Sequence, residues 1–328
     1  MSTLTLDGAT GIGEVVDSQY SEPMPTRRRN WRLALRRDWQ LYTMAILPIA
    51  QLIAFSYIPM FGIIIAFRRF RPAGSLIGDE FVGLHFFRLA FAQPQFWNAF
   101  FNTVILGGLW FIIGFPLPII LALLLNEVRN RKFKRVVQTI TYLPHFLSIV
   151  IVVGLIQEIV SPTGPINQLI QQFGGTPIIF LQHSEWFRPI WIISEAWQTV
   201  GWGTILYLAA LTTIDDQLYE AARIDGANRW QQTWHVTLPG LLPTIVVLMV
   251  LNVGTFLSVG FEKVLLLQNP LTILGDADVV STYLFRLALG GGQFSLGTAV
   301  GLFQSLIGLI LILTSNFISR KLVGSSLW

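Results

Sequence analysis

The chain has 328 residues, of which 53% are hydrophobic and 12% are charged, and its formal net charge is +4. A typical soluble domain carries about 25% charged residues, so this composition excludes an ordinary soluble protein and indicates a membrane protein. The absence of cysteine excludes a disulfide framework and thiolate chemistry.

The N-terminal segment has the wrong charge for a signal peptide. Residues 1–26 contain four acidic residues and no lysine or arginine, whereas a secretory signal begins with a basic region. We therefore predict that residues 1–34 form a cytosolic, largely disordered tail. Residues 35–319 are predicted to form the membrane domain, and residues 320–328 a second, short cytosolic tail.

Long apolar runs predict an all-α, polytopic membrane helix bundle. Five charge-free runs, and a sixth interrupted only by Glu195, each exceed the roughly 20 residues that cross a bilayer core. Six such runs in one chain argue against buried helices of a large soluble protein. Transmembrane helices are expected near residues 41–67, 98–125, 136–159, 190–213, 238–262 and 297–318.

The distribution of basic residues predicts the orientation in the membrane. With the N-terminus inside, the inner segments hold 15 of the 22 lysines and arginines, and the outer segments hold 7. Because basic residues concentrate on the cytoplasmic side, both termini and the stretch 219–239 are expected there. Anionic membrane lipid, rather than nucleic acid, is the expected partner of the basic clusters.

The stretch 219–239, YEAARIDGANRWQQTWHVTLP, has the pattern of two short helices between membrane spans. One of the two aspartates at 215–216 can cap the first helix, and Gly226 suits the left-handed turn that ends it. A second helix is expected over residues 228–236, with Pro239 in the first turn of the next span. The pattern predicts a rigid cytosolic knob that inserts into a groove of another protein. A helical loop lying on the lipid surface remains an alternative.

The same stretch resembles a signature of the membrane subunits of bacterial ABC importers: E-A-A, three residues, G, nine residues, I-x-L-P. The matching positions are Glu220, Ala221, Ala222, Asp225, Gly226, Leu238 and Pro239. Val236 stands where isoleucine is usual. The resemblance implies that residues 215–236 include the coupling helix, which docks into a separate ATPase. It also implies the five-helix core of type I importers, with one extra N-terminal helix.

Three further segments resemble the oligosaccharide permeases of this family, including alginate-oligosaccharide importers. They are RRDWQLYTMAILPIAQLIAFSYIPMFGIIIAFRRF, SPTGPIN and FEKVLLLQNP. The resemblance implies a permease subunit in the bacterial cytoplasmic membrane, half of a path for oligosaccharides that are expected to be anionic. It implies as partners a second homologous permease in a heterodimer, two ATPase subunits and a periplasmic solute-binding protein. The sequence contains no phosphate loop, so ATP and Mg²⁺ are expected on the partner ATPase.

The resemblance also places the substrate path along the last helices. Aromatic faces and amides suit sugar rings, which present apolar C–H faces bounded by hydroxyls. The candidate residues are Gln198, Trp202, Tyr207, Asn252, Thr255, Ser258, Glu262 and Lys263. Packing remains an alternative role for Trp202 and Tyr207. Lys263 is expected to face a sugar carboxylate; the competing interpretation pairs it with Glu262 or lipid phosphate.

Catalytic and metal-binding sites are not expected. The histidines at positions 85, 145, 183 and 235 lack metal-ligand spacing, so each is interpreted as a loop or interfacial residue. Two other functions remain open. An ion-coupled secondary carrier requires ionisable residues near the midplane and an inverted repeat, and neither is evident. A membrane-embedded transferase requires converging acids, for which only Asp79, Glu80, Asp276 and Asp278 are candidates.

Overall fold

The computed structural model describes residues 39–75, 77–273 and 275–323, and it divides into two compact units with a boundary between Phe61 and Gly62. The predicted tail 1–34 lies outside the described residues. The leading unit contains α2 (Trp39–Leu52), a π-helical turn (Ile53–Tyr57) and α3 (Ile58–Met60). Pro59 lacks an N–H and its ring clashes with the preceding turn, which explains why the helix widens just before it.

The second unit is a helix bundle with one two-residue hairpin, β1 (Arg68–Arg69) with β2 (Glu80–Phe81). A 3₁₀ segment (Phe61–Phe67) leads into it. The α-helices are α4 (His85–Phe91), α5 (Pro94–Gly114), α6 (Pro116–Glu127), α7 (Arg131–Tyr142), α8 (Ile149–Ile159), α9 (Pro165–Gln172), α10 (Phe187–Leu211), α11 (Asp216–Ile224), α12 (Arg229–Gln232), α13 (Leu238–Gly254), α14 (Phe261–Leu267), α15 (Val280–Phe285) and α16 (Phe294–Val323). Short 3₁₀ segments lie at Leu143–Phe146, Phe180–Gln182 and Ser184–Trp186, and π-helical turns at Thr233–Thr237 and Arg286–Gly290.

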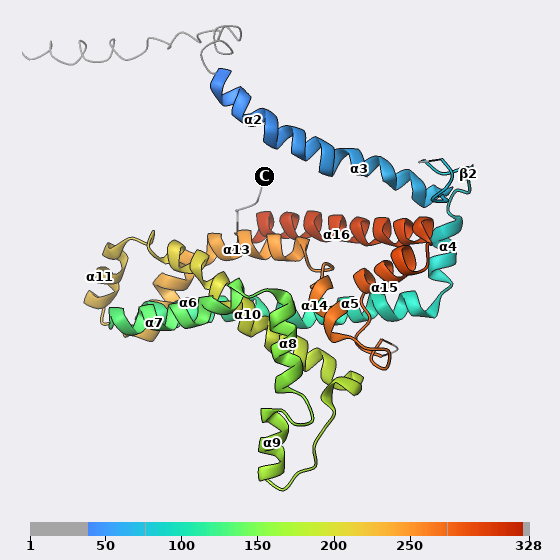
Figure 1. Cartoon of the computed structure of the whole chain (residues 1–328). Coiled ribbons are helices and arrows are strands. Elements are labelled where there is room, and N and C mark those ends of the chain that lie inside the picture. The colour runs from blue at the N-terminus through green and yellow to red at the C-terminus, as the bar shows by residue number, and fades with distance from the viewer. Residues whose placement is uncertain (1–38, 76, 274, 324–328) are drawn as a thin grey trace, which may run out of the picture. The chain divides into compact units, whose positions relative to one another are not determined.

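The long helices of this unit lie side by side. Helix α10 packs against α5, α6, α7 and α13, and α13 packs against α16. Helix α11 lies at one end of the bundle, whereas α4 and α15 lie at the other (Figure 1). The C-terminal helix α16 continues to Val323, beyond the predicted end of the membrane domain at residue 319.

The number of membrane spans differs from the sequence-based expectation. Within the described residues, four helical runs are long and apolar enough to cross a membrane: Trp39–Phe67, Pro94–Glu127, Arg229–Gly254 and Phe294–Lys321. Arg131–Phe146 and Ile149–Ile159 make a fifth only if they count as one span, because a 103° bend separates them. The all-α membrane bundle is therefore confirmed, but the count of six is not.

Two of the six predicted spans account for the difference. In the span predicted at 136–159, Pro144 lies in the 3₁₀ turn before the bend, and Leu147 has extended backbone that ends the helix. The span predicted at 190–213 corresponds to α10, which is long enough to cross a membrane but is not among the sufficiently apolar runs. The span predicted at 238–262 is present but ends early, since α13 stops at Gly254.

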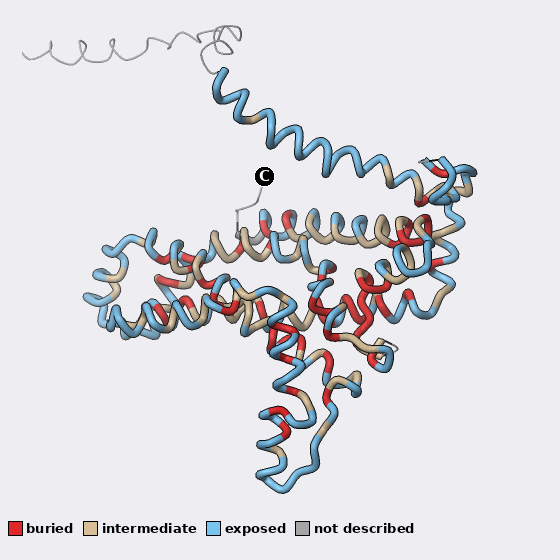
Figure 2. Tube along the Cα trace, in the orientation of Figure 1, coloured by how far each residue is buried: buried red, intermediate tan, exposed pale blue. Residues whose placement is uncertain are grey.

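Buried residues, coloured red along the chain in Figure 2, include three hydrophobic clusters between the helices. One joins α5, α8, α10 and α14, the second joins α4, α5, α15 and α16, and the third joins α6, α10 and α13. Glycine permits the closest backbone approaches. A Cβ atom on Gly201 of α10 would overlap the carbonyl oxygen of Thr141 in α7, and one on Gly107 of α5 would lie 2.5 Å from the carbonyl oxygen of Phe256.

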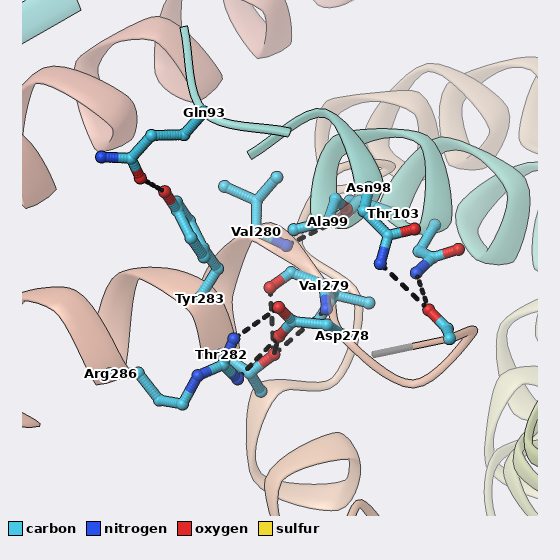
Figure 3. A network of polar contacts seen from close by, with 12 residues as sticks. Gln93, Asn98, Ala99, Thr103, Asp278, Val279, Val280, Thr282, Tyr283 and Arg286 are labelled. Atoms are coloured by element: carbon cyan, nitrogen blue, oxygen red, sulfur yellow. Dashed lines mark hydrogen bonds and ion pairs between the residues drawn. The ribbon is translucent and has the colours of Figure 1, made fainter. Parts of the chain in front are cut away.

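A polar network ties the segment 275–290 to α5 (Figure 3). Arg286 forms two hydrogen bonds with the carboxylate of Asp278, whose side chain is 4% exposed. The backbone N–H of Val280 donates to the hydroxyl of Thr103 at 2.8 Å. Tyr283 donates to the Gln93 side chain, and burial, followed by the charge of Asp278, raises the pKa of its phenol. These bonds hold the end of the bundle opposite α11.

The same contacts bear on the acids considered for a transferase. Asp276 pairs with Arg188 at 2.7 Å, and Asp278 is occupied by Arg286. Glu80 lies 3.5 Å from Arg69, and Asp79 accepts the N–H of Ser75. Each candidate acid therefore has a structural partner, and the four do not converge on one site.

Candidate functional site: a helical knob and a cavity at a helix break

The segment between α10 and α13 forms the predicted knob. Asp215 caps α11, because its carboxylate accepts the N–H of Gln217 at 2.9 Å. Gly226 ends the helix with a φ of +79°, the left-handed conformation that favours glycine. Asn228 and Gln231 then form a reciprocal capping box that starts α12. Residues close together in the sequence therefore specify the start of α11, the turn that ends it and the start of α12.

One contact joins the two limbs of the knob to each other, and a second contact joins the knob to α6. The hydroxyls of Tyr219 and Thr237 lie 3.0 Å apart and connect its two limbs. Arg229 donates to the carboxylate of Glu127, at the end of α6, over 2.9 Å. The knob is thus braced against the end of α6.

The second limb differs from the prediction. A separate helix over residues 228–236 is wrong, since α12 passes through the π-helical turn Thr233–Thr237 directly into α13. The widened turn precedes Pro239, which lacks the N–H needed for a regular helical hydrogen bond. Trp230 and Trp234 do share a face, with ring centroids 5.9 Å apart. The second limb of the knob and α13 therefore form one continuous helical run.

The residues predicted for coupling lie together on this knob. Glu220, Ala221, Asp225, Gly226 and Pro239 are exposed, whereas Ala222 and Leu238 are partly buried. A concavity of about 300 Å³ is lined by Ala222, Asp225, Gly226, Ala227, Gln231, His235 and Val236. Large apolar side chains lie exposed beside it, including Ile224 at 87% and Trp230 at 70%. The coupling assignment itself stays a prediction.

The second feature is a break in the bundle after α13. Residues 255–260 are not helical, and they connect α13 to the short α14. The carbonyl of Leu257 accepts a hydrogen bond from Gln304 of α16 at 2.7 Å. Unwound backbone inside a membrane protein is tolerated where it is hydrogen-bonded or lines a cavity. Here both conditions are met.

A cavity of about 120 Å³ lies at this break. It is lined by Gly107, Trp110, Phe111, Phe115, Trp191, Glu195, Asn252, Thr255, Phe256, Ser258, Val259 and Gly260. The structure thus brings together three of the predicted path residues, Asn252, Thr255 and Ser258. Each of the three is exposed.

The other predicted path residues do not line this cavity. Tyr207 is 3% exposed in the cluster between α6, α10 and α13. Trp202 stacks on His145, with ring centroids 4.4 Å apart and planes at 5°. Gln198 is partly buried and Glu262 is exposed. The packing alternative therefore describes the contacts of Trp202 and Tyr207.

Lys263 has a partner that the sequence did not reveal. Its side chain is 2% exposed, and its Nζ lies 2.5 Å from Oε2 of Glu195 in α10. Pairing with Glu262, one of the expected alternatives, is not what the structure contains. The ammonium also lies 6.0 Å from the ring centroid of Trp191. Lys263 is thus enclosed by protein, and Glu195 separates it from the cavity.

Five aromatic residues of the cavity were missed from the sequence: Trp110, Phe111, Phe115, Trp191 and Phe256. Aromatic residues are common throughout this chain, so their spacing gave no signal. The α5–α6 break at Phe115, before Pro116, was the available clue, since a proline-associated break near the midplane is where transporter sites form. For metals, the described residues contain no group of three or more potential His or acidic ligands.

Comparison with known proteins identifies the family. A family model described as the binding-protein-dependent transport system inner membrane component matches residues 114–324. The chain belongs to this family. It is a permease subunit of the sugar and oligosaccharide ABC transporters, and such a subunit is not an enzyme.

Relatives from Bacillus subtilis (strain 168) cover nearly the whole permease subunit. Protein LplB is 42% identical over 311 residues, which are 94% of this chain and 98% of LplB. The polygalacturonan/rhamnogalacturonan transport system permease protein YteP is 46% identical over 297 residues, 90% of this chain and 92% of YteP.

Two solved structures share the fold. One is a bacterial ABC transporter involved in the import of the acidic polysaccharide alginate, with a TM-score of 0.82, 42% identity, and coverage of 89% of this chain and 99% of that chain. The other is a bacterial alginate ABC transporter in complex with an alginate pentasaccharide-bound periplasmic protein, with a TM-score of 0.84, 42% identity, and coverage of 91% and 100%. The type I importer fold expected from the coupling motif is thereby confirmed.

Proposed function

We propose that this permease subunit forms half of the translocation path of an ATP-driven, binding-protein-dependent importer of acidic oligosaccharides. The observation that carries the proposal is the substrate class of its relatives. A polygalacturonan/rhamnogalacturonan permease matches 90% of the chain at 46% identity, and a subunit of an alginate importer matches 89% of the chain at 42% identity. Galacturonan and alginate are both polymers of uronic acids, so the two relatives share carboxylated sugars as cargo.

In this proposal the knob couples the subunit to a separate ATPase. Its capped, braced geometry suits a rigid insertion element, and the exposed Ile224 and Trp230 offer apolar area that a protein partner would cover. Glu220, Arg223 and Asp225 are exposed and supply polar anchors around that area. The ATPase subunits bind ATP and Mg²⁺.

The remaining partners follow from the same proposal. A second, different permease completes the path, and a periplasmic solute-binding protein delivers the cargo. Both termini and the knob face the cytoplasm, so the segment 275–290, at the opposite end of the bundle, faces the binding protein. The basic residues near α7 meet anionic lipid headgroups.

Reconstitution tests this function directly. The subunit is co-expressed with its partner permease and ATPase, placed in liposomes, and supplied with binding protein and either uronic-acid oligomers or the same oligomers with their carboxylates reduced to alcohols. We expect uptake and ATP hydrolysis to respond to the acidic oligomers more strongly. Uptake driven by an ion gradient without ATP would instead support a secondary carrier, and a stronger response to the reduced oligomers would remove the acidic-cargo assignment.

A further inference from the structure

The charge of the cavity at the helix break is unusual for a path that carries acidic sugars. Among its lining residues in the described chain, Glu195 is the charged one, and it is an acid. Carboxylates in a partly dehydrated site repel each other, so an unpaired Glu195 would hinder a uronic acid. The positive charge needed to offset it lies directly behind, on Lys263.

The pair is arranged with the acid toward the cavity and the base away from it. The Glu195 side chain is 21% exposed and lines the cavity, whereas Lys263 is 2% exposed and does not. Oε2 of Glu195 receives the ammonium, and the other oxygen, Oε1, has no protein partner among the described residues. Cargo in the cavity can therefore reach a carboxylate oxygen, but it cannot reach the ammonium.

Glu195 is the cavity residue whose free polar atom can only accept. One amide N–H of Asn252 donates to the carbonyl of Leu248 at 2.8 Å, and the hydroxyl of Thr255 donates to the carbonyl of Asn252 at 3.2 Å. The second amide N–H and the oxygen of Asn252, the hydroxyl of Ser258 and Oε1 of Glu195 remain for a ligand. A sugar hydroxyl can donate to Oε1 of Glu195. An ionised carboxylate cannot, because both groups only accept.

The walls add the complementary apolar contact. Trp110, Phe111 and Phe115 line one side of the cavity, and aromatic faces suit the C–H faces of sugar rings. A hydroxyl group both donates and accepts, so it is the sugar substituent that suits the donors and the acceptors of this cavity alike.

We propose that Glu195 is a sugar-hydroxyl acceptor in this cavity, and that Lys263 acts as a positioning residue that neutralises Glu195 instead of binding the carboxylate of the cargo. The inference rests on the proposed function and names the part of the cargo that this site recognises. It replaces the direct contact between Lys263 and a carboxylate expected from the sequence. Selection for acidic sugars then occurs outside this cavity.

Removing first one charge and then both charges of the pair tests the proposal in the complete, reconstituted complex. Lys263→Met leaves Glu195 unpaired, so uptake of a uronic-acid oligomer should fall about tenfold more than uptake of its carboxyl-reduced counterpart. Glu195→Gln combined with Lys263→Met removes both charges. If neutralisation is the role of Lys263, the double variant should recover uptake of the acidic oligomer to within about threefold of the wild type.

Direct contact gives the opposite outcome. If Lys263 binds the carboxylate of the cargo, the double variant stays as slow with the acidic oligomer as Lys263→Met, and the proposal is overturned. A lack of any selective effect in Lys263→Met also overturns it. Should Lys263→Met fail to fold, the double variant alone decides, because retained acidic uptake supports neutralisation and lost uptake contradicts it. Arg69→Met, which breaks an exposed ion pair away from the cavity, is the matched control. Failure of the wild-type complex to take up either oligomer would instead reject the proposed function.

Discussion

The hydroxyl of Tyr219, in α11, lies 3.0 Å from the hydroxyl of Thr237, at the end of the second limb of the knob. Thr237 is 3% exposed and Tyr219 is partly buried, and their contact joins the two limbs of the knob. The bond therefore links α11 to the helical run that continues as α13.

Tyr219→Phe is therefore expected to weaken coupling without removing the subunit from the complex. Loss of one hydrogen bond costs about 0.5–1.5 kcal/mol, which corresponds to a two- to tenfold loss in cargo-stimulated ATP hydrolysis if the bond holds the docked conformation. Stimulation is measured with the reconstituted complex. Tyr57→Phe, at an exposed tyrosine of the leading helical run, serves as the control. Full stimulation in Tyr219→Phe would show that the limbs need no such link.

Gly226→Leu tests the knob through its backbone. No atom lies within 4 Å of a Cβ placed on Gly226, so its φ of +79° is the source of strain, at about 1–2 kcal/mol. We expect the variant to remain in the membrane but to lose most cargo-stimulated ATP hydrolysis. Gly174→Leu is a matched control, since Gly174 has a φ of +81° and equally open surroundings but lies outside the knob. Equal losses in the two variants would contradict a specific role in docking.

Local signals explain why the knob could be predicted from the sequence. Its aspartate cap and glycine turn, and the asparagine that opens the second limb, each act within a few residues, and the coupling motif fixes their order. The second limb was predicted less well, because the π-helical turn before Pro239 lets it merge with α13.

Tertiary contacts explain why the cavity could not be predicted. The Glu195–Lys263 pair joins residues 68 positions apart, on helices whose relative rotation is not encoded in hydropathy. Tryptophan is a residue type that suits sugar rings, yet the side chain of Trp202 stacks on His145. Asn252, Thr255 and Ser258 were found because they lie on one segment near its unwound end.

The close approach of α10 and α7 gives a prediction about stability. Gly201→Ala places a Cβ atom against the carbonyl oxygen of Thr141, and backbone cannot move aside as a flexible side chain can. Overpacking of this kind costs about 1–3 kcal/mol, so thermal unfolding of the purified subunit in detergent should begin several degrees lower. Gly154→Ala, in α8 with no atom within 4 Å, should leave the unfolding temperature unchanged or higher. A wild-type melting temperature for Gly201→Ala would mean that the two helices separate easily.

Topology gives a fourth prediction. The 15-to-7 division of basic residues predicts that reporters fused after Lys134 and after Gly226 both lie in the cytoplasm. A fusion after Gly174, in the loop that follows α9, should lie outside. Protease protection and reporter activity in whole cells report the side directly. An external signal at Lys134 or Gly226 would reverse the orientation and separate the knob from any cytosolic ATPase.

The buried pair at the opposite end of the bundle gives the last prediction. Asp278 is 4% exposed and receives two hydrogen bonds from Arg286, whose side chain is 36% exposed. Arg286→Met leaves a buried carboxylate with the hydroxyl of Thr282 as its remaining donor. An unpaired buried charge costs 3–5 kcal/mol in a fully buried pair, and the partial exposure of Arg286 reduces this to about 2 kcal/mol.

Thermal unfolding in detergent measures this cost, with a melting temperature several degrees below the wild type as the expected result. Arg286→Met combined with Asp278→Asn should recover most of the loss, because the remaining amide is neutral. Arg69→Met provides the surface reference: its partner Glu80 is 64% exposed at 3.5 Å, so the change should cost less than about 1 kcal/mol. If the double variant melts no higher than Arg286→Met, the unpaired charge is not the cause. The bidentate geometry, which fixes the segment 275–290, would then be the stabilising element, and binding-protein-stimulated ATP hydrolysis should fall in both variants.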